Sequence, residues 1–231
     1  MTKEERREKQ KERLQEMQEI EKKLHEQGYK YIAGIDEVGR GPLAGPVVTA
    51  AVVLPEDCGI LGIDDSKKLS EKRREELSGL IIENCIAYGI GICEHDVVDE
   101  INILQATKRA MKQAIKECEA MLASRAAAGK VNEDRGDSAR IDYVLIDALR
   151  LEDLEIPQQA IIKGDSKALA IAAASIVAKV TRDRMMVEYA KEYPYYAFER
   201  NKGYGTAAHY AGIREHGTCP IHRMTFLKNL H

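Results

Sequence analysis

Four carboxylates of this sequence stand where apolar segments end. Asp36 and Glu37 follow the apolar run 31–35, Asp147 ends a second apolar run, and Asp165 lies between a short strand and a helix. Because sites in open α/β sheets are built at strand ends, such side chains can meet there. Buried neighbouring carboxylates repel each other and lose hydration, which protons, basic neighbours or a divalent metal must offset. Oxygen-only ligands favour Mg²⁺ or Mn²⁺ over zinc, and a pair of such ions can activate water against a phosphodiester.

Each acid also has an interpretation without chemistry. Asp165, directly before Ser166, could cap the following helix, which is the commonest use of aspartate there. Asp147 could form an ion pair with Arg150. Asp183 competes with Asp165 for the fourth place among the acids. It lies about five helical turns beyond Ser166, too far to share a site with Asp165 unless the helix bends.

A set of three residues that follows the first acid pair suits a ligand that carries phosphate or sugar hydroxyls. Gly39 and Gly41 flank Arg40, and glycine lets the backbone approach a ligand closely. Exposed backbone N–H groups and a guanidinium together favour such a ligand. The alternative is a charged hairpin turn after an edge strand. It fits poorly, because the apolar run resumes at 47–54 and leaves the charged segment between two core strands.

Further candidates for substrate binding are Ser66, Lys67, Lys167 and Tyr204. The first three lie in Asp-Ser-Lys segments at helix starts, where hydroxyls and lysines suit phosphates and where ordinary capping is the alternative. Tyr204 stands between two glycines, a poor place for a core aromatic and a good one for packing against a sugar or base.

Histidines and an arginine near the C-terminus admit both structural and functional interpretations. His209 and His216 lie seven residues apart on one helix face, where packing, and for His216 a C-terminal cap, are favoured over phosphate contact. His222 and Arg223 either belong to a functional tail or lie on the surface.

These segments together resemble a known family. The run GIDEVGRGPLAGPVV, the strand end YVLIDAL and the segment KGDSKALAIAAASIVAKVTRD are similar to the type 2 ribonucleases H, and the chain over about 31–226 looks like a bacterial ribonuclease HII. The resemblance implies that Asp36, Glu37, Asp147 and Asp165 are the catalytic, metal-binding set. It also implies a ribonuclease H-like fold and two Mg²⁺ or Mn²⁺ ions.

The same resemblance implies a substrate. Members of this family cut the RNA strand of RNA/DNA hybrids and nick 5′ of a ribonucleotide embedded in duplex DNA, leaving 5′-phosphate and 3′-hydroxyl ends. Gly39, Arg40, Gly41 and Tyr204 match the family's sensor of the ribose 2′-hydroxyl. Two alternatives stay open: a hybrid-binding module without catalysis, and a different nuclease or strand-transferring enzyme on the same fold.

The elements that must position these residues follow from periodicity. Residues 1–28 predict a charged helix with a narrow apolar stripe. It is interpreted as a solvated appendage in preference to a nucleic-acid-gripping arm, and docking of the stripe on the body stays open. Residues 29–231 predict an α/β catalytic domain with a mixed β-sheet flanked by helices and a C-terminal helical segment. The expected strands are 31–36, 47–54, 85–93, 143–146 and 159–163; the expected helices are 70–84, 103–125, 166–191 and 206–216; a polar loop is expected at 126–140.

Composition narrows the class of protein. The 231 residues carry a formal net charge of −3, so nucleic-acid contacts must come from local patches. Five cysteines without a Cys-x-x-Cys pair argue against a disulfide framework and a zinc site, and predict a reducing cytoplasmic setting. No apolar run approaches a membrane span, and a monomer is the default expectation.

Overall fold

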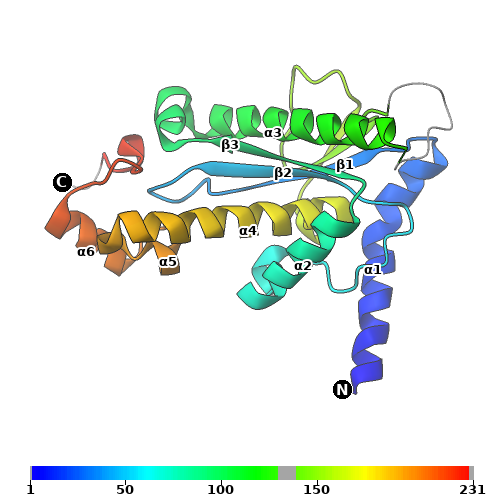
Figure 1. Cartoon of the computed structure of the whole chain (residues 1–231), viewed down its shortest axis with the longest axis horizontal. Helices are drawn as coiled ribbons and strands as arrows, with labels where there is room; N and C mark the ends of the chain where they lie inside the picture. The colour runs from blue at the N-terminus through cyan, green and yellow to red at the C-terminus, as the bar shows by residue number, and fades with distance from the viewer. Residues whose placement is uncertain (1, 130–138, 229–231) are drawn as a thin grey trace.

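The computed structural model describes residues 2–129 and 139–228, which form three layers with one sheet in the middle (Figure 1). Helix α3 covers one face of the sheet, and α2 and α4 cover the other. The strands are β1 (Ile32–Val38), β2 (Val47–Val53), β3 (Ala87–Cys93), β4 (Tyr143–Asp147) and β5 (Gln158–Ile161). The helices are α1 (Lys3–Glu26), α2 (Glu71–Asn84), α3 (His95–Ala127), α4 (Leu169–Glu192), α5 (Phe198–Asn201) and α6 (Ala207–His216).

The strand order β3-β2-β1-β4-β5 makes the sheet mixed, as the sequence predicts. Strands β1, β2 and β3 pair antiparallel, whereas β4 pairs parallel with both β1 and β5. The parallel register sets Ile35 beside Ile146. The residues that follow them, Asp36 and Asp147, therefore lie side by side. Asp147 ends β4, but β1 runs two residues beyond the predicted strand end at Asp36, through Glu37 to Val38.

The core explains why the central strands are almost wholly apolar. Every residue of β2 is buried, because α3 packs on one of its faces and α4 on the other. The alanine-rich start of α4 lies very close to β1: a Cβ on Gly34 would lie 2.0 Å from the carbonyl carbon of Ala170. Small residues on both elements thus bring α4 to the strand that carries the first two acids.

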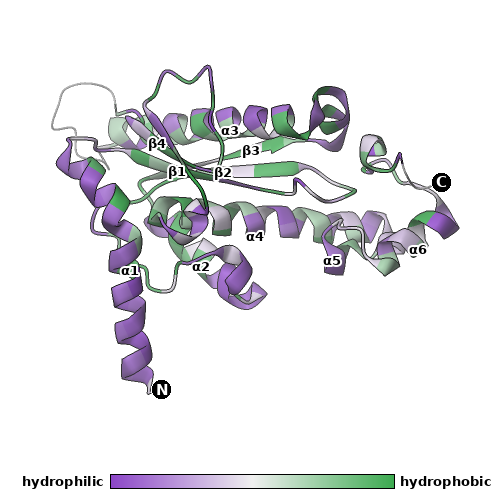
Figure 2. Cartoon of the chain, turned by 180° about the vertical axis from the view of Figure 1, so that it is seen from behind, coloured by the Kyte–Doolittle hydropathy of each residue, from purple (hydrophilic) through white to green (hydrophobic). Residues whose placement is uncertain are grey.

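Helix α1 corrects the interpretation of residues 1–28 as a solvated appendage. Its N-terminal part is exposed and hydrophilic (Figure 2). Met17 and Leu24, farther along the helix, are buried in the body. Glu21 accepts a hydrogen bond at 2.8 Å from the backbone N–H of Ala170, in the first turn of α4. The apolar stripe therefore docks the second half of α1 on the body. A domain boundary at residue 28 stays a prediction.

Three other expectations differ from the structure at their ends. Helix α3 begins at His95, not 103, and its helical geometry is interrupted at Asn102, whose φ of 68° kinks it. Helix α4 begins at Leu169, because residues 164–166 form a separate 3₁₀ turn. The expected loop 126–140 begins later, because α3 extends to Ala127, and its residues 130–138 lie outside the described residues. Within the described part of the chain, no helix is long and apolar enough to cross a membrane.

Candidate active site

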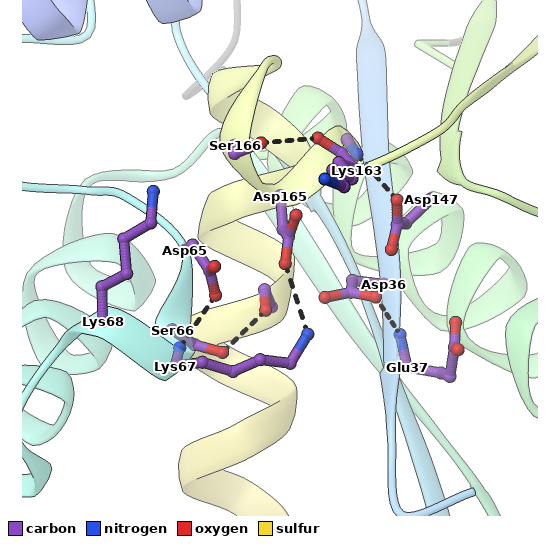
Figure 3. Close-up of polar contacts among 12 residues, drawn as sticks. Asp36, Glu37, Asp65, Ser66, Lys67, Lys68, Asp147, Lys163, Asp165 and Ser166 are labelled. Carbon is purple, nitrogen blue, oxygen red and sulfur yellow. Dashed lines mark hydrogen bonds and ion pairs between the residues drawn. The ribbon is translucent and has the colours of Figure 1, made fainter.

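Three of the four predicted acids face one another at the edge where β1, β4 and β5 end (Figure 3). Asp36 is carried by β1 and Asp147 by the last position of β4. Asp165 comes from the 3₁₀ turn Gly164–Ser166, which follows β5. Glu37 is the next residue on β1 and continues the row. The structure thus brings these residues to one region, and their role as the catalytic, metal-binding set stays a prediction.

Burial and mutual repulsion make this cluster unfavourable for negative charge. Asp36 is only 6% exposed, and burial, followed by the charges of Glu37 and Asp147, raises its pKa well above the ordinary value. Burial likewise raises the pKa of Glu37, with Arg40 opposing the shift. The pKa of Asp165 is raised first by burial and then by the charge of Asp65. Such shifts concentrate at sites that bind cations or move protons.

Polar neighbours hold the acids in place. Asp147 Oδ1 accepts a hydrogen bond of 2.7 Å from the backbone N–H of Gly164, which ties the end of β4 to the turn before Asp165. The Nζ of Lys67 lies 3.5 Å from Asp165 Oδ2. Ser175 of α4 stabilises the charged form of Asp36 and so opposes the rise of its pKa. Sequence reasoning missed Ser175, although a lone serine within the alanine-rich run was the available signal.

The purely structural interpretations of Asp165 as a helix cap and of Asp147 as an ion-pair partner do not fit the structure. The residue that caps α4 is Ala168, which makes no side-chain capping bond, so Asp165 does not serve as that cap. Among the described residues, no ion pair joins Asp147 to Arg150. The competitor Asp183 is instead paired with Lys179 of its own helix at 2.7 Å.

The donor set fits a hard divalent cation by its chemistry. All four predicted ligands offer carboxylate oxygens, and Glu37 Oε2 is buried without a hydrogen-bond partner. As the side chains stand, however, the described residues include no group of three or more His, Cys, Asp or Glu that could hold a metal ion. One oxygen of Asp147 is engaged by Gly164, and Asp165 is paired with Lys67. Joint ligation by all four acids therefore requires side-chain rotation.

The backbone beside the acids is in unusual conformations. Ala148, directly after Asp147, has φ of 50°, and Lys163, two residues before Asp165, has φ of 59°. Each such residue in the left-handed region costs of order 1–3 kcal/mol. The surrounding structure therefore imposes these turns, one directly after Asp147 and the other two residues before Asp165.

The predicted Gly39-Arg40-Gly41 loop is held from behind by a buried arginine. Arg223 is fully buried, and its guanidinium donates to the carbonyls of Gly39 at 2.7 Å, Arg40 at 3.1 Å, Pro42 at 3.0 Å and Gly45 at 2.7 and 2.9 Å. The interpretation of Arg223 as a surface residue is wrong for that reason. With its carbonyls turned to Arg223, the loop leaves its outer face to a ligand.

A second buried arginine joins this loop to the segment that carries Tyr204. Arg182 donates to the carbonyls of Pro46 at 2.8 Å and Ala44 at 3.0 Å, and to that of Lys202 at 2.8 Å. Gly39 has φ of +92°, and a Cβ there would lie 2.2 Å from Arg182 Nε, so only glycine fits.

Tyr204 lies beside the glycine loop, as the predicted sensor requires. It is 46% exposed, and a Cβ on Gly41 would lie 3.5 Å from Tyr204 Cε1. Arg40 is exposed at the same loop, and its Nη1 lies 3.3 Å from Glu37 Oε1. The loop and the acids therefore form one continuous surface.

A pair of buried histidines supports Tyr204 from below. His209 Nδ1 lies 2.9 Å from the carbonyl oxygen of Tyr204, and His209 Nε2 lies 3.0 Å from His222 Nε2. His222 Nδ1 accepts a hydrogen bond of 2.9 Å from the N–H of Cys219. Both rings are buried, so neither the phosphate interpretation of His209 nor the surface interpretation of His222 fits.

The remaining predicted substrate residues differ in accessibility. Lys67 is exposed at the site, and Lys167 is exposed just after Asp165. Ser66 is buried, and its hydroxyl lies 2.9 Å from that of Ser175. Ser66 therefore positions Ser175, which stabilises the charge of Asp36. A direct contact between Ser66 and substrate stays a prediction.

Comparison with known proteins connects this geometry to a family. The family model described as Ribonuclease HII matches residues 33–229. A ribonuclease HII of Enterococcus faecalis is 51% identical over 213 residues, 92% of this chain and 76% of the relative. The fold is similar to ribonuclease H2 of Pyrococcus horikoshii OT3, with a TM-score of 0.58, 24% identity, and coverage of 86% of this chain and 99% of the other.

A further solved structure with the same fold is Bst-RNase HIII in complex with Mn²⁺. Its TM-score is 0.56 at 19% identity, over 87% of this chain and 66% of the other.

Proposed function

The chain belongs to the ribonuclease HII family of metal-dependent endoribonucleases, and we propose that it hydrolyses the RNA strand of RNA/DNA hybrids and nicks duplex DNA 5′ of an embedded ribonucleotide. The observation that carries the proposal is the buried carboxylate cluster where β1 and β4 end, next to a glycine loop with a half-exposed tyrosine. The products are a 5′-phosphate and a 3′-hydroxyl.

Asp36, Glu37, Asp147 and Asp165 would hold the metal ions. The unpartnered Oε2 of Glu37 and the raised pKa of buried Asp36 support this role, because a cation offsets both the lost hydration and the repulsion. Bound Mg²⁺ or Mn²⁺ would supply Lewis acidity toward the phosphodiester and a water of lowered pKa. The Mn²⁺ bound to Bst-RNase HIII supports the choice of a hard divalent ion.

The remaining residues orient the substrate. Lys67, exposed and paired with Asp165, would contact a phosphate at the edge of the site, as would Lys167, which is exposed two residues after Asp165. The outer face of the Gly39–Gly41 loop and the hydroxyl of Tyr204 would contact the ribose 2′-hydroxyl, which only a ribonucleotide carries. This division separates cleavage at the acids from recognition at the loop.

Three labelled duplexes test the proposal. The purified protein with Mg²⁺ or Mn²⁺ should cut an RNA/DNA hybrid, should nick 5′ of a single ribonucleotide in DNA, and should leave an all-DNA duplex uncut. End analysis should find 5′-phosphate and 3′-hydroxyl groups. If the folded protein binds the hybrid but cuts no duplex with either metal, the chain is instead a hybrid-binding module without catalysis.

The recognition role of Tyr204 has its own test. Tyr204→Phe removes one hydroxyl from an exposed ring, and we expect cleavage at a lone ribonucleotide to fall about tenfold, the effect of one lost hydrogen bond to a reacting substrate. Tyr195→Phe is the matched control, because Tyr195 is also exposed and stacks on His216 with ring centroids 3.9 Å apart. Equal activity of both variants would remove Tyr204 from the sensor.

A further inference from the structure

A basic groove lies between the exposed half of α1 and the loop that precedes α2. Its volume is about 380 Å³, and its charged lining consists of Arg6, Lys9 and Arg13 from α1 and Asp64 and Lys68 from the loop. Four cations against one carboxylate give the lining a net charge of +3. Local charge of this sign on a chain with a net charge of −3 indicates an anionic ligand.

The helix separates charges that the sequence interleaves. Arg6, Lys9 and Arg13 are spaced three and four residues apart and therefore share one face of α1. Although acids alternate with them along the chain, none of the glutamates of α1, all of which the structure describes, lines the groove. One of these glutamates, Glu16, pairs with the lining residue Arg13 at 3.2 Å, whereas Arg6 and Lys9 have no acidic partner in the described structure.

Two of the cations are engaged and two are available. Arg13 Nη2 lies 3.2 Å from Asp64 Oδ1, and Lys68 Nζ lies 3.4 Å from the same oxygen. Arg6 and Lys9 are exposed, and in the described structure neither side chain makes an ion pair or a hydrogen bond. The paired residues fix the groove's shape, and the unpaired ones leave its positive charge to a ligand.

The groove begins at the edge of the candidate active site. Arg13 Nη2 donates a 2.7 Å hydrogen bond to the carbonyl of Ser166, the residue after Asp165. Lys68 follows Lys67, whose Nζ approaches Asp165. Seven residues of helix place Arg6 about 10 Å beyond Arg13, a span of about three phosphates along one strand.

We propose that this groove binds the phosphate backbone of the substrate duplex beyond the cleavage site, so that α1 extends the substrate-binding surface. The inference rests on the proposed function, because it takes the nucleic acid to be the one cut at the acids. Phosphate contacts of this kind carry no sequence information and make binding sensitive to salt.

The test compares two double variants of α1. R6Q/K9Q removes the two unpaired cations of the groove, whereas R7Q/K11Q removes two cations of the same helix that do not line it. Glutamine preserves helix propensity in both variants. Binding of a labelled RNA/DNA hybrid, long enough to pass over the acids and α1, is measured without divalent metal between about 50 and 200 mM salt. Cleavage of the same hybrid with Mg²⁺ is measured in parallel.

We expect R6Q/K9Q to bind the hybrid roughly tenfold more weakly at the lowest salt, and its slope of log affinity against log salt to fall by about 2, since each neutralised phosphate contributes about 0.9. R7Q/K11Q should match the wild type. If the wild type cleaves the hybrid and both variants bind it equally well, the groove serves another ligand, such as an acidic protein. In that case this inference alone is overturned. A wild type that neither binds nor cleaves the hybrid overturns the proposed function and the groove with it.

Discussion

Asp36 and Arg223 are buried charged side chains that lie on opposite sides of the Gly39–Gly41 loop. Their surroundings differ. Asp36 is surrounded by other carboxylates, whose charges raise its pKa. Arg223 faces backbone carbonyls, which accept hydrogen bonds from every nitrogen of its guanidinium. Burial lowers the pKa of Arg223 to about 9, and no carboxylate lies within ion-pair distance of it in the described structure.

The difference separates a binding site from its frame. A buried charge that is fully hydrogen-bonded resists rearrangement, because losing a partner leaves a desolvated group unsatisfied. A buried charge among like charges is stabilised when an opposite charge binds beside it. The acids therefore keep their affinity for a cation, while the arginines fix the loop that must recognise the ribose.

The largest expected effect is on the acid side. Asp147→Asn removes one charge and keeps an oxygen that can accept from Gly164, so the turn before Asp165 should survive. We expect turnover on an RNA/DNA hybrid to fall by about a thousandfold or more, ~4 kcal/mol of lost transition-state stabilisation. The melting temperature should stay equal or rise, because a repulsion is removed.

Asp153→Asn is the control for this variant, because Asp153 is an exposed acid on the segment after β4, paired with Lys112 at 3.0 Å. It should cleave like the wild type. Turnover that survives in Asp147→Asn, or a large loss of stability there, would show that Asp147 belongs to the frame rather than to the site.

Substitution of the buried Arg223 should lower the stability of the protein. Arg223→Lys keeps the charge but replaces a planar five-donor fork with a point charge, so several loop carbonyls lose their partners. We expect the free energy of unfolding to fall by about 2–4 kcal/mol, and cleavage at a single ribonucleotide to fall with it. Urea unfolding provides the measurement.

Arg184→Lys supplies the matched substitution at an exposed arginine of α4, which pairs with Glu75. Its free energy of unfolding should change by no more than about 0.5 kcal/mol. If Arg223→Lys were equally mild, the carbonyl contacts would not stabilise the loop, and the contrast with the acids would collapse.

The proximity of the acids was partly predictable from the sequence, and the partners of the arginines were not. The apolar run that stops at Asp147 marks the end of β4, and strand ends have a known place in α/β sheets. The run before Asp36 stops two residues short of the end of β1, and Asp165 joined the predicted set through family resemblance. The partners of Arg182 and Arg223 are backbone carbonyls, which no residue pattern marks. The choice of a ribonuclease H-like fold also rests on family resemblance rather than on periodicity, which other α/β arrangements would satisfy.

Helix α1 shows the same limit. Its apolar stripe predicts that one face can dock, and Met17 and Leu24 do so. The contact of Glu21 with the first turn of α4 depends on where two distant helices meet, and the sequence contains no sign of it. The three-residue turn that shifts the start of α4 from 166 to 169 is equally local to the folded structure.

The smallest expected effect concerns the histidine pair below Tyr204, where protonation should weaken the frame. His222 Nδ1 accepts from the N–H of Cys219, so its Nε2 carries the proton and donates to His209, whose Nδ1–H donates to the carbonyl of Tyr204. A second proton on His222 would face the N–H of Cys219 at 2.9 Å, and the carbonyl oxygen of Cys219, 3.2 Å from the same nitrogen, only partly offsets this cost. Burial first, and then the charge of His209, lower the pKa of His222 to about 4 from 6.5.

Between these two pKa values the unfolded chain binds more protons than the folded one, so stability is present above about pH 6.5 and is lost as the pH falls toward 4. We expect about 2 kcal/mol less free energy of unfolding at about pH 5 than at about pH 7 from this residue. The acids work in the opposite direction, because a carboxyl whose pKa is raised by folding stabilises the fold as the pH falls. Urea unfolding of the wild type and of His222→Asn at both pH values isolates the histidine: the wild type should lose more stability than the variant. Equal losses would mean that the pair takes up a proton without breaking, and that the loop does not depend on its neutral form.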